Sequence, residues 1–415
     1  MFLQRLRRGA ASLLVVATAF GLGPAAPAID APFAAAQQPP GQMRGVWIST
    51  VANIDWPSRS GLSAAEQQQE YRAILDNAVR LRLNAVVVQV RPTADALWPS
   101  PFEPWSQWLT GVQGRDPGYD PLAFLVQEAH LRGLEFHAWF NPFRVSRQAD
   151  PARLVPEHPA RTHPDWVFGY GGQLYYNPGI PEVRQFVTEA VMDAVTRYDV
   201  DAVHFDDYFY PYPVGGEQIP DGATFAQYGG AFTDVGDWRR DNVNQLVRGM
   251  SERIDAVKPE VEFGISPFGI WRNASTEPRG SATDGLESFS AIYADSVTWV
   301  EQGWVDYIAP QIYWEIGHRA ADYAVLVPWW AGVVAGTGVE LYVGQAAYKV
   351  GSTPAWDVAE LSEHLTLNRA HPEVSGDVYF SARSLTSNAA AAIEQVAAEH
   401  YAQPAPSPDA EACPS

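Results

Sequence analysis

The sequence predicts one closed (β/α)₈ barrel with long βα-loops that form a substrate cleft. Three observations favour this fold. Strand-like apolar runs alternate with helical runs eight times, which is typical of parallel strands joined by helices. Polar side chains gather at the ends of the strand-like runs, where barrels of this class carry their chemistry. No glycine-rich phosphate loop follows the first run, which disfavours an open doubly wound sheet.

The elements follow in regular order along the chain. The strand-like runs cover residues 44–52, 84–92, 134–142, 201–209, 261–269, 305–314, 341–350 and 376–385. Helical patterns fit residues 63–82, 181–198, 238–257, 286–302, 322–335, 355–369 and 388–400. Two long loops, rich in Trp, Tyr and Pro, are predicted over residues 142–180 and 209–236. Loops of this length are usually functional, so we expect them to form the cleft walls.

The two ends of the chain differ in composition from the middle. Residues 1–36 combine a basic start, an apolar run too short to span a membrane and small-residue cleavage sites, which predicts a signal peptide. The barrel is expected over residues 37–402, and a disordered Pro/Ala-rich tail over 403–415. The expected location is therefore secreted, extracellular or associated with the cell wall.

Charge and cysteine content exclude several classes of partner. The formal net charge is −20, which disfavours nucleic acid and anionic membranes as partners. The single cysteine, Cys413, permits neither an internal disulfide nor a zinc–thiolate site. The sequence predicts no cofactor.

The stretch VDAVHFDDYFYP ends the fourth strand-like run in two adjacent carboxylates. By the two-residue strand period, Asp206 should share a face with His204 and point into the barrel mouth, while Asp207 points the other way. Carboxylates at the end of a barrel strand indicate chemistry more often than capping. Glu315, which follows PQIYW at the end of the sixth run, is the expected second carboxylate. Glycoside cleavage needs two such groups, so we predict catalytic roles for Asp206, Asp207 and Glu315.

Other polar and aromatic residues at the strand ends are candidates for substrate binding. They are Gln89, Arg91, His137, Trp139, Asn141, His204, Tyr208, Gln311, Tyr313, Trp314 and Lys349. The sequence lacks a His-x-His pair, which disfavours a metallohydrolase, and we predict no metal site.

Aromatic residues are concentrated in or beside the predicted loops, and flat amphipathic rings are typical of sugar-binding sites. They are Trp98, Trp105, Trp108, Trp166, Tyr170, Tyr175, Tyr176, Tyr208, Tyr210, Tyr212 and Trp314. Packing within the loops explains such residues equally well, and we expect it to account for about half of them.

Six motifs occur in order along the chain: MRGVWISTVANIDWPS, HAWFNPFR, HFDDYFYP, SPFGIWRN, PQIYW and GQAAYK. With these motifs, the chain closely resembles the glycosyl hydrolase-like 10 family over residues 42–400. The resemblance implies an exported barrel of the glycosidase type, in a family with a bacterial member that cleaves peptidoglycan glycan strands. Tyr208 stands where a chitinase would carry its glutamate acid, which disfavours the chitinase mechanism.

The predicted function is a secreted glycoside hydrolase that acts on a cell-wall polysaccharide, with the glycan strands of peptidoglycan as the favoured substrate. Two alternatives belong to other classes. One is a glycan-binding barrel without catalytic activity, and the other is a metal-dependent deacetylase or amidase acting on the same polymer.

Overall fold

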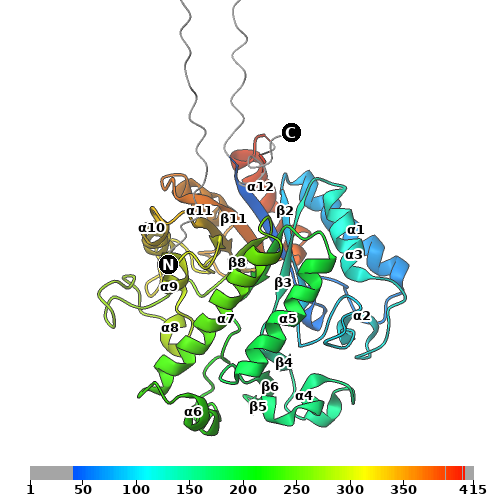
Figure 1. The fold of residues 1–415 in the computed structure, drawn as a ribbon. Helices are drawn as coiled ribbons and strands as arrows, with labels where there is room; N and C mark the ends of the chain where they lie inside the picture. The colour runs from blue at the N-terminus through cyan, green and yellow to red at the C-terminus, as the bar shows by residue number, and fades with distance from the viewer. Residues whose placement is uncertain (1–40, 388, 404, 407–415) are drawn as a thin grey trace, which may run out of the picture. The chain divides into compact units, whose positions relative to one another are not determined.

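The computed structural model describes residues 41–406 apart from 388 and 404 (Figure 1). Eight parallel strands close into a barrel in the order β1-β11-β10-β9-β8-β7-β3-β2, which confirms the predicted fold. The strands are β1 Met43–Ile48, β2 Ala85–Arg91, β3 Glu135–Phe140, β7 Ala202–Phe205, β8 Glu262–Ile265, β9 Tyr307–Ile308, β10 Glu340–Gln345 and β11 Val374–Phe380. The predicted signal peptide, most of the predicted tail and Cys413 lie outside the described residues.

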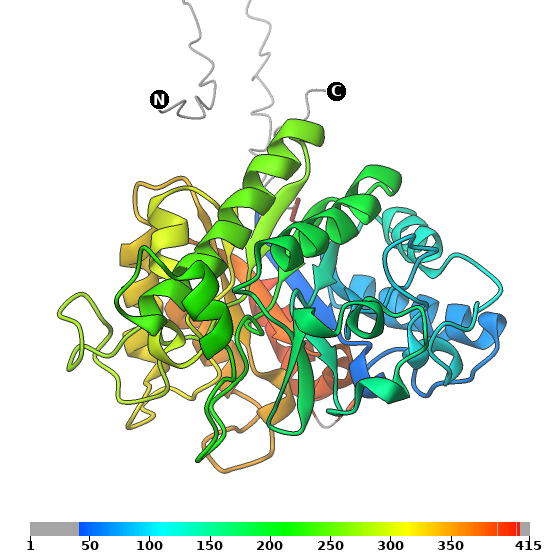
Figure 2. The ribbon, with the colours of Figure 1, turned by 60° about the horizontal axis from the view of Figure 1, so that its bottom comes forward.

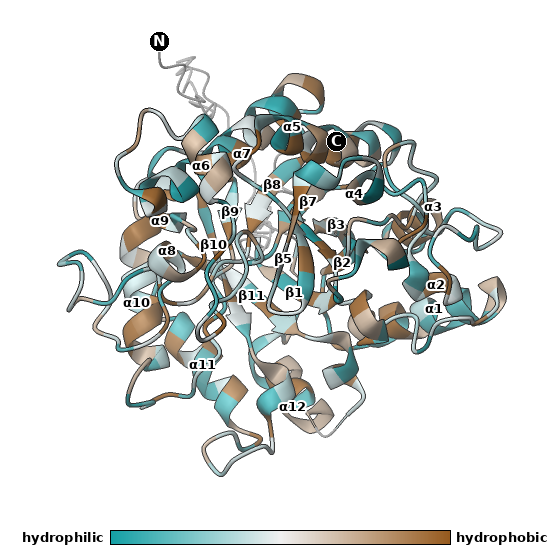
Figure 3. Cartoon of the chain, turned by 90° about the horizontal axis from the view of Figure 1, so that it is seen from below, coloured by the Kyte–Doolittle hydropathy of each residue, from teal (hydrophilic) through white to brown (hydrophobic). Residues whose placement is uncertain are grey.

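Helices surround the ring of strands, as the view along the barrel shows (Figure 3). The principal helices are α1 Ala64–Arg80, α3 Pro121–His130, α5 Pro181–Arg197, α7 Val235–Val257, α9 Ser296–Glu301, α10 Tyr323–Val334, α11 Glu360–Asn368 and α12 Ala390–His400. The predicted list lacked α3, and the helix predicted over 286–302 is two short helices, α8 Ser288–Ala291 and α9. Tyr293 interrupts that segment with a φ of 57°, a left-handed conformation that an α-helix cannot accommodate.

Strand alternation sorts the side chains of the barrel between two cores. In β2, Val86 and Val88 face the helices, while Ala85 and Val87 face the barrel interior. The interior cluster also contains Trp47 and residues from other strands. Because the strands are buried on both faces, they are apolar almost throughout, which is typical of parallel sheets.

The helix ends follow from local sequence signals. Ser63 and Glu66 form a reciprocal capping box at the start of α1, which satisfies free backbone N–H groups of the first turn. Pro181 occupies the first turn of α5, where its missing N–H has no intrahelical partner to lose.

The two long predicted loops contain ordered elements at the carboxyl ends of the strands. The first contains the antiparallel sheet β4-β6-β5, formed by β4 Arg144–Ser146, β5 Val167–Tyr170 and β6 Gln173–Tyr176. This sheet projects from the barrel at the end where β3 finishes (Figure 2). The second contains α6 Gly222–Tyr228. These elements therefore form an ordered wall on this side of the barrel.

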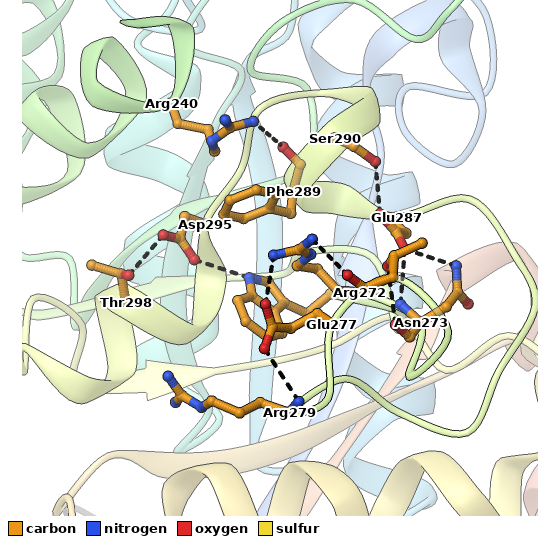
Figure 4. Close-up of polar contacts among 12 residues, drawn as sticks. Arg240, Arg272, Asn273, Glu277, Arg279, Glu287, Phe289, Ser290, Asp295 and Thr298 are labelled. Carbon is orange, nitrogen blue, oxygen red and sulfur yellow. Dashed lines mark hydrogen bonds and ion pairs between the residues drawn. The ribbon is translucent and has the colours of Figure 1, made fainter. Parts of the chain in front are cut away.

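A network of polar contacts braces the loop between β8 and α9 (Figure 4). The Glu287 carboxylate accepts hydrogen bonds from the backbone and side-chain amides of Asn273 and from the Ser290 hydroxyl. Arg272 forms an ion pair with Glu277 at 2.9 Å. These contacts hold the loop that follows β8, whose first residues reach the barrel mouth.

The opposite end of the barrel contacts the last described residues. Carbonyl oxygens of Gln403, Ala405 and Pro406 accept hydrogen bonds from Arg44, Asn84 and Gln42, respectively. The start of the predicted tail is therefore bound to the barrel floor. Within the described residues, no helix is long and apolar enough to cross a membrane.

Candidate active site

A cavity of about 370 Å³ opens at the carboxyl ends of the barrel strands. Its lining comes from β1, β2, β3 and β11, from β4 and β6 in the first long loop, and from loops that follow other strands. The lining residues are Trp47, Ser49, Val51, Ile54, Gln89, Trp139, Arg144, Arg147, Gln173, Asp206, Asp207, Tyr208, Tyr212, Ser266, Gln311, Tyr313, Tyr348 and Phe380. Concave sites at this face are the usual location of chemistry in barrels of this class.

Asp206 and Asp207 both line the cavity and both are buried. The prediction that Asp207 points away from the mouth is wrong, because β7 ends at Phe205 and strand alternation does not continue beyond it. Asp206 accepts hydrogen bonds from the side-chain amide of Asn141 and, at 3.1 Å, from the backbone N–H of Tyr208. Asn141 donates to Oδ2 and Tyr208 to Oδ1, and the Trp139 indole also lowers the pKa of Asp206.

The two carboxyl groups have different surroundings, which affect their pKa values differently. Burial, followed by the neighbouring charge of Asp207, raises the pKa of Asp206 to about 7. Burial also raises the pKa of Asp207, but hydrogen bonds from Tyr212 and Gln311 oppose that rise. Two adjacent carboxyl groups resist double ionisation, and this asymmetry favours Asp206 as the carrier of a proton near neutral pH.

Arg91 does not reach the cavity, contrary to the prediction that it binds substrate. Its guanidinium forms a fully buried ion pair with Glu103 at 2.5 Å and donates to the backbone carbonyls of Asn141 and Pro142. The register between β2 and β3 shifts between Gln89 and Arg91. Such an irregularity re-aims the side chains beyond it, so Arg91 loses the phase of Gln89.

His137 and His204 lie in the barrel interior and do not line the cavity, which corrects their predicted role. The Trp47 indole, which can only donate, is 3.3 Å from Nε2 of His204, and the Ser266 hydroxyl donates to the same nitrogen at 2.9 Å. His204 Nδ1–H therefore donates to the Tyr307 hydroxyl at 2.9 Å, and that hydroxyl donates to His137 Nδ1 at 2.9 Å. His137 Nε2 completes the chain at Glu135, 3.3 Å away.

This chain explains why the histidines remain structural. Burial, and then the neighbouring His137, lowers the pKa of His204 well below its ordinary value, so it stays neutral. Tyr307 fits between the two rings because position 264 is glycine: a Cβ there would lie 2.0 Å from the tyrosine ring. The two histidines lie on the predicted interior face, but they lie deeper in the barrel than the side chains that line the cavity.

Glu315 and Lys349 also lie apart from the cavity. β9 ends at Ile308, so the strand phase expected to carry Glu315 into the mouth is lost. The Glu315 carboxylate instead accepts a hydrogen bond from the Trp356 indole at 3.0 Å. Lys349 donates to the backbone carbonyl of Tyr313 and so helps to hold that cavity-lining residue in place. The prediction of Glu315 as second cavity carboxylate is therefore corrected, and Asp206 and Asp207 are the acidic side chains among the described lining residues.

Aromatic rings surround the cavity, but few are the ones that the loop composition indicated. Tyr313, Tyr348 and Phe380 contact one another at centroid distances of 6.0 to 6.3 Å. Tyr348 is 53% exposed at the rim and offers a surface for stacking. From the predicted aromatic set, Tyr208 and Tyr212 line the cavity. Trp314 packs against the core instead, and Trp98, Tyr176 and Tyr210 are fully buried.

The structure thus brings together Gln89, Trp139, Asp206, Asp207, Tyr208, Gln311 and Tyr313. Asn141 does not line the cavity but contacts Asp206 directly. Lining residues that were not predicted are Trp47, Ser49, Val51, Ile54, Arg144, Arg147, Gln173, Ser266, Tyr348 and Phe380. The inward phase of β1 could have indicated Trp47. Gln173 reaches the site only because the β5–β6 hairpin folds back, and no sequence pattern indicated this.

No group of three or more His, Cys, Asp or Glu side chains within the described residues is arranged to hold a metal ion. The cavity instead combines a buried carboxyl pair, amide donors and aromatic surfaces. That combination suits proton transfer to a polyhydroxylated ligand.

A model of the family described as glycosyl hydrolase-like 10 matches residues 42–360. The chain belongs to the glycosyl hydrolase-like 10 family. Two similar relatives bear out the assignment. The chain is 52% identical over 383 residues to the glycosyl hydrolase YngK of Bacillus subtilis, covering 91% of this chain and 75% of that protein. It is 46% identical over 378 residues to the glycosyl hydrolase DigH of Escherichia coli, covering 85% and 86% of the two chains.

Solved structures support the fold of this glycosyl hydrolase-like chain. The glycoside hydrolase domain of PgaB (BpsB) from Bordetella bronchiseptica matches with a TM-score of 0.55 and 13% identity, over 85% of this chain and 98% of that domain. An alpha-L-fucosidase from Paenibacillus thiaminolyticus also gives 0.55, with 15% identity over 87% of this chain and 49% of the fucosidase. At these identities the likeness concerns the barrel architecture alone.

Proposed function

We propose that this protein is an exported glycoside hydrolase that cleaves the glycan strands of bacterial peptidoglycan. Asp206 is the general acid that protonates the leaving glycosidic oxygen. Asp207 supplies negative charge beside the anomeric carbon as positive charge develops there in the transition state. The aromatic rim holds the sugar rings by stacking.

One observation carries this proposal: two adjacent buried carboxyl groups share the cavity but have unequal hydrogen-bond partners. Asp207 accepts from both Tyr212 and Gln311, which favours its charged form. Burial and the neighbouring charge of Asp207 raise the pKa of Asp206, which suits an acid that must hold a proton near neutral pH. Family membership supports the same reaction class.

The rim of the cavity also supports an anionic substrate. Arg147 follows β4, is exposed, and forms no hydrogen bond or ion pair through its side chain with any other described residue. In a chain of net charge −20, an unpaired cation at the cavity entrance is complementary to a negatively charged ligand. Peptidoglycan carries carboxylates on its sugars and stem peptides, whereas chitin is neutral.

The direct test is incubation with purified peptidoglycan, with and without a chelator, followed by product identification. New reducing ends that form equally in both arms support the glycosidase. Released acetate or stem peptide would instead indicate the deacetylase or amidase. Binding without any product would indicate a glycan-binding barrel.

Arg147→Gln should raise KM for peptidoglycan strands by roughly two- to fivefold, because an exposed ion pair contributes up to about 1 kcal/mol. The value of kcat should change little, since Arg147 lies at the rim. Arg115→Gln makes the same charge change at an exposed site outside the cavity lining and serves as the control. Michaelis–Menten kinetics at low salt measure both variants. Equal KM values for wild type and Arg147→Gln would remove the charge argument for this substrate.

A further inference from the structure

A chain of hydrogen bonds leads from the backbone after β1 to the carboxyl group of Asp206. The backbone N–H groups of Thr50 and Val51 donate to Gln89 Oε1 at 3.1 and 2.9 Å. The Ser49 hydroxyl donates to the same oxygen at 3.2 Å. Because a backbone N–H can only donate, this end of the Gln89 amide must be its oxygen.

The orientation of Gln89 decides that of the next amide. Its Nε2 group faces Asn141 and donates to Asn141 Oδ1. Arg144 Nη2 donates to the same oxygen at 3.1 Å. With two donors on its oxygen, Asn141 must present its Nδ2 group to Asp206 Oδ2. Gln89 and Asn141 are both fully buried, so no exchange with bulk water relaxes this arrangement.

We propose that Gln89 and Asn141 are positioning residues that set the proton affinity and orientation of Asp206 from the backbone of residues 50 and 51. This inference rests on the proposed function, in which Asp206 is the acid. Neither residue needs to touch the reacting atoms, because both act through the carboxyl group. The arrangement replaces the substrate-binding role that the sequence predicted for Asn141.

The physical effect follows from the direction of the bond. A donor to a carboxylate stabilises the charged form and lowers its pKa, which opposes the burial of Asp206. The other charged or titratable groups facing Asp206 are Asp207, Arg144, Tyr208 and Tyr212. The Asn141 donor thus keeps the acid able to release its proton, as proton transfer requires.

We refer to the hydrogen-bonded chain that runs from the backbone of residues 50 and 51 through Gln89 and Asn141 to Asp206 as the relay. Gln89→Glu reverses its direction without changing side-chain size. The introduced side chain, when ionised, still accepts from the two backbone N–H groups, but its second oxygen cannot donate to Asn141. The Asn141 amide is then driven to rotate against the Arg144 contact that holds its oxygen, and the rotated amide together with the added negative charge favours protonated Asp206. We expect the falling alkaline limb of the kcat/KM profile to move up by about one pH unit. We also expect kcat at neutral pH to fall about tenfold while KM stays within about twofold.

A matched control makes the same chemical change elsewhere in the barrel. Gln345 is equally buried and donates to Asp377 on the outer side of β10, away from the cavity. Gln345→Glu should lower the melting temperature but leave the pH profile in place. Gln89→Met, which removes the donor without adding charge, should move the alkaline limb in the same direction by less, because Arg144 still holds the Asn141 oxygen. If Gln89→Glu does not fold, the pH profile of Gln89→Met tests the relay in its place.

A readout without substrate separates this inference from the proposed function. Carboxyl ¹³C titration of aspartate-labelled protein reports the pKa of Asp206, assigned by the signal missing in Asp206→Asn. A raised pKa in Gln89→Glu, together with the shifted limb, supports the relay. A raised pKa in a protein that cleaves no glycan keeps the relay and removes the proposed reaction. An active enzyme whose Gln89 variants fold and retain the wild-type pKa and pH profile overturns the relay alone.

Discussion

Asp206→Asn should lower kcat on peptidoglycan strands by roughly two to four orders of magnitude, while glycan binding persists. The substituted amide keeps the shape of the carboxyl group and can still accept a hydrogen bond. It cannot deliver a proton to the leaving oxygen, so the loss falls on kcat and not on KM. Steady-state kinetics, combined with a binding measurement on insoluble peptidoglycan, test both parts of this expectation.

Two other carboxyl variants serve as comparisons. Asp207→Asn should cost less than Asp206→Asn, because it removes the charge that stabilises the transition state and helps to raise the pKa of Asp206 but leaves the proton donor in place. Glu315→Gln should stay close to wild type, since that carboxylate contacts Trp356 outside the cavity. If Asp206→Asn turns over normally while either of the others is inactive, the acid has been assigned to the wrong residue.

Arg91→Met should lower the free energy of unfolding by about 3–5 kcal/mol, which is the usual cost of leaving a buried charge without its partner. The side chains of Arg91 and Glu103 are both completely buried, and the pair is 2.5 Å apart. Removal of the guanidinium also leaves the carbonyl oxygens of Asn141 and Pro142 without their donor. Chemical denaturation measures the loss.

The double variant Arg91→Met/Glu103→Met is the control. It removes both charges together and should recover a large part of the lost stability, because no unpaired charge remains in the core. Near-normal stability of Arg91→Met combined with a large rise in KM would contradict this view. That result would return Arg91 to the substrate-binding role that the sequence first indicated.

The barrel could be predicted from the sequence because the pattern that encodes it is local and repeated. Eight apolar runs separated by amphipathic segments have few compact arrangements, and right-handed parallel crossovers close them into a ring. The carboxyl ends of all strands then lie on one face. For this reason the sequence could also bring Gln89, Trp139, Asp206 and Tyr313 to the same cavity, although they are far apart along the chain.

Strand phase was an unreliable guide past a strand end: it placed Asp206, Gln311 and Tyr313 correctly at the cavity but failed for Asp207 and Glu315. Asp207 follows the end of β7 and turns toward the cavity, whereas Glu315 lies well beyond the short β9 and turns away from it. The register shift in β2 re-aims Arg91 in the same manner. Strand alternation is a property of the hydrogen-bonded ladder, so it becomes unreliable within a few residues of the point where the ladder ends or slips.

The sequence by itself determined the barrel, the face that carries the site and the acidic pair at its centre. Only the tertiary structure decided the depth of His137 and His204, the entry of Gln173 and Arg147 from the wall of the cavity, and the amide chain that reaches Asp206. The depth of the two histidines depends on how the strands are staggered around the ring. The wall of the cavity depends on how the loop after β3 folds back over the barrel. The direction of the Gln89–Asn141 chain depends on backbone donors from another strand end, so it arises from contacts between distant segments that no local pattern records.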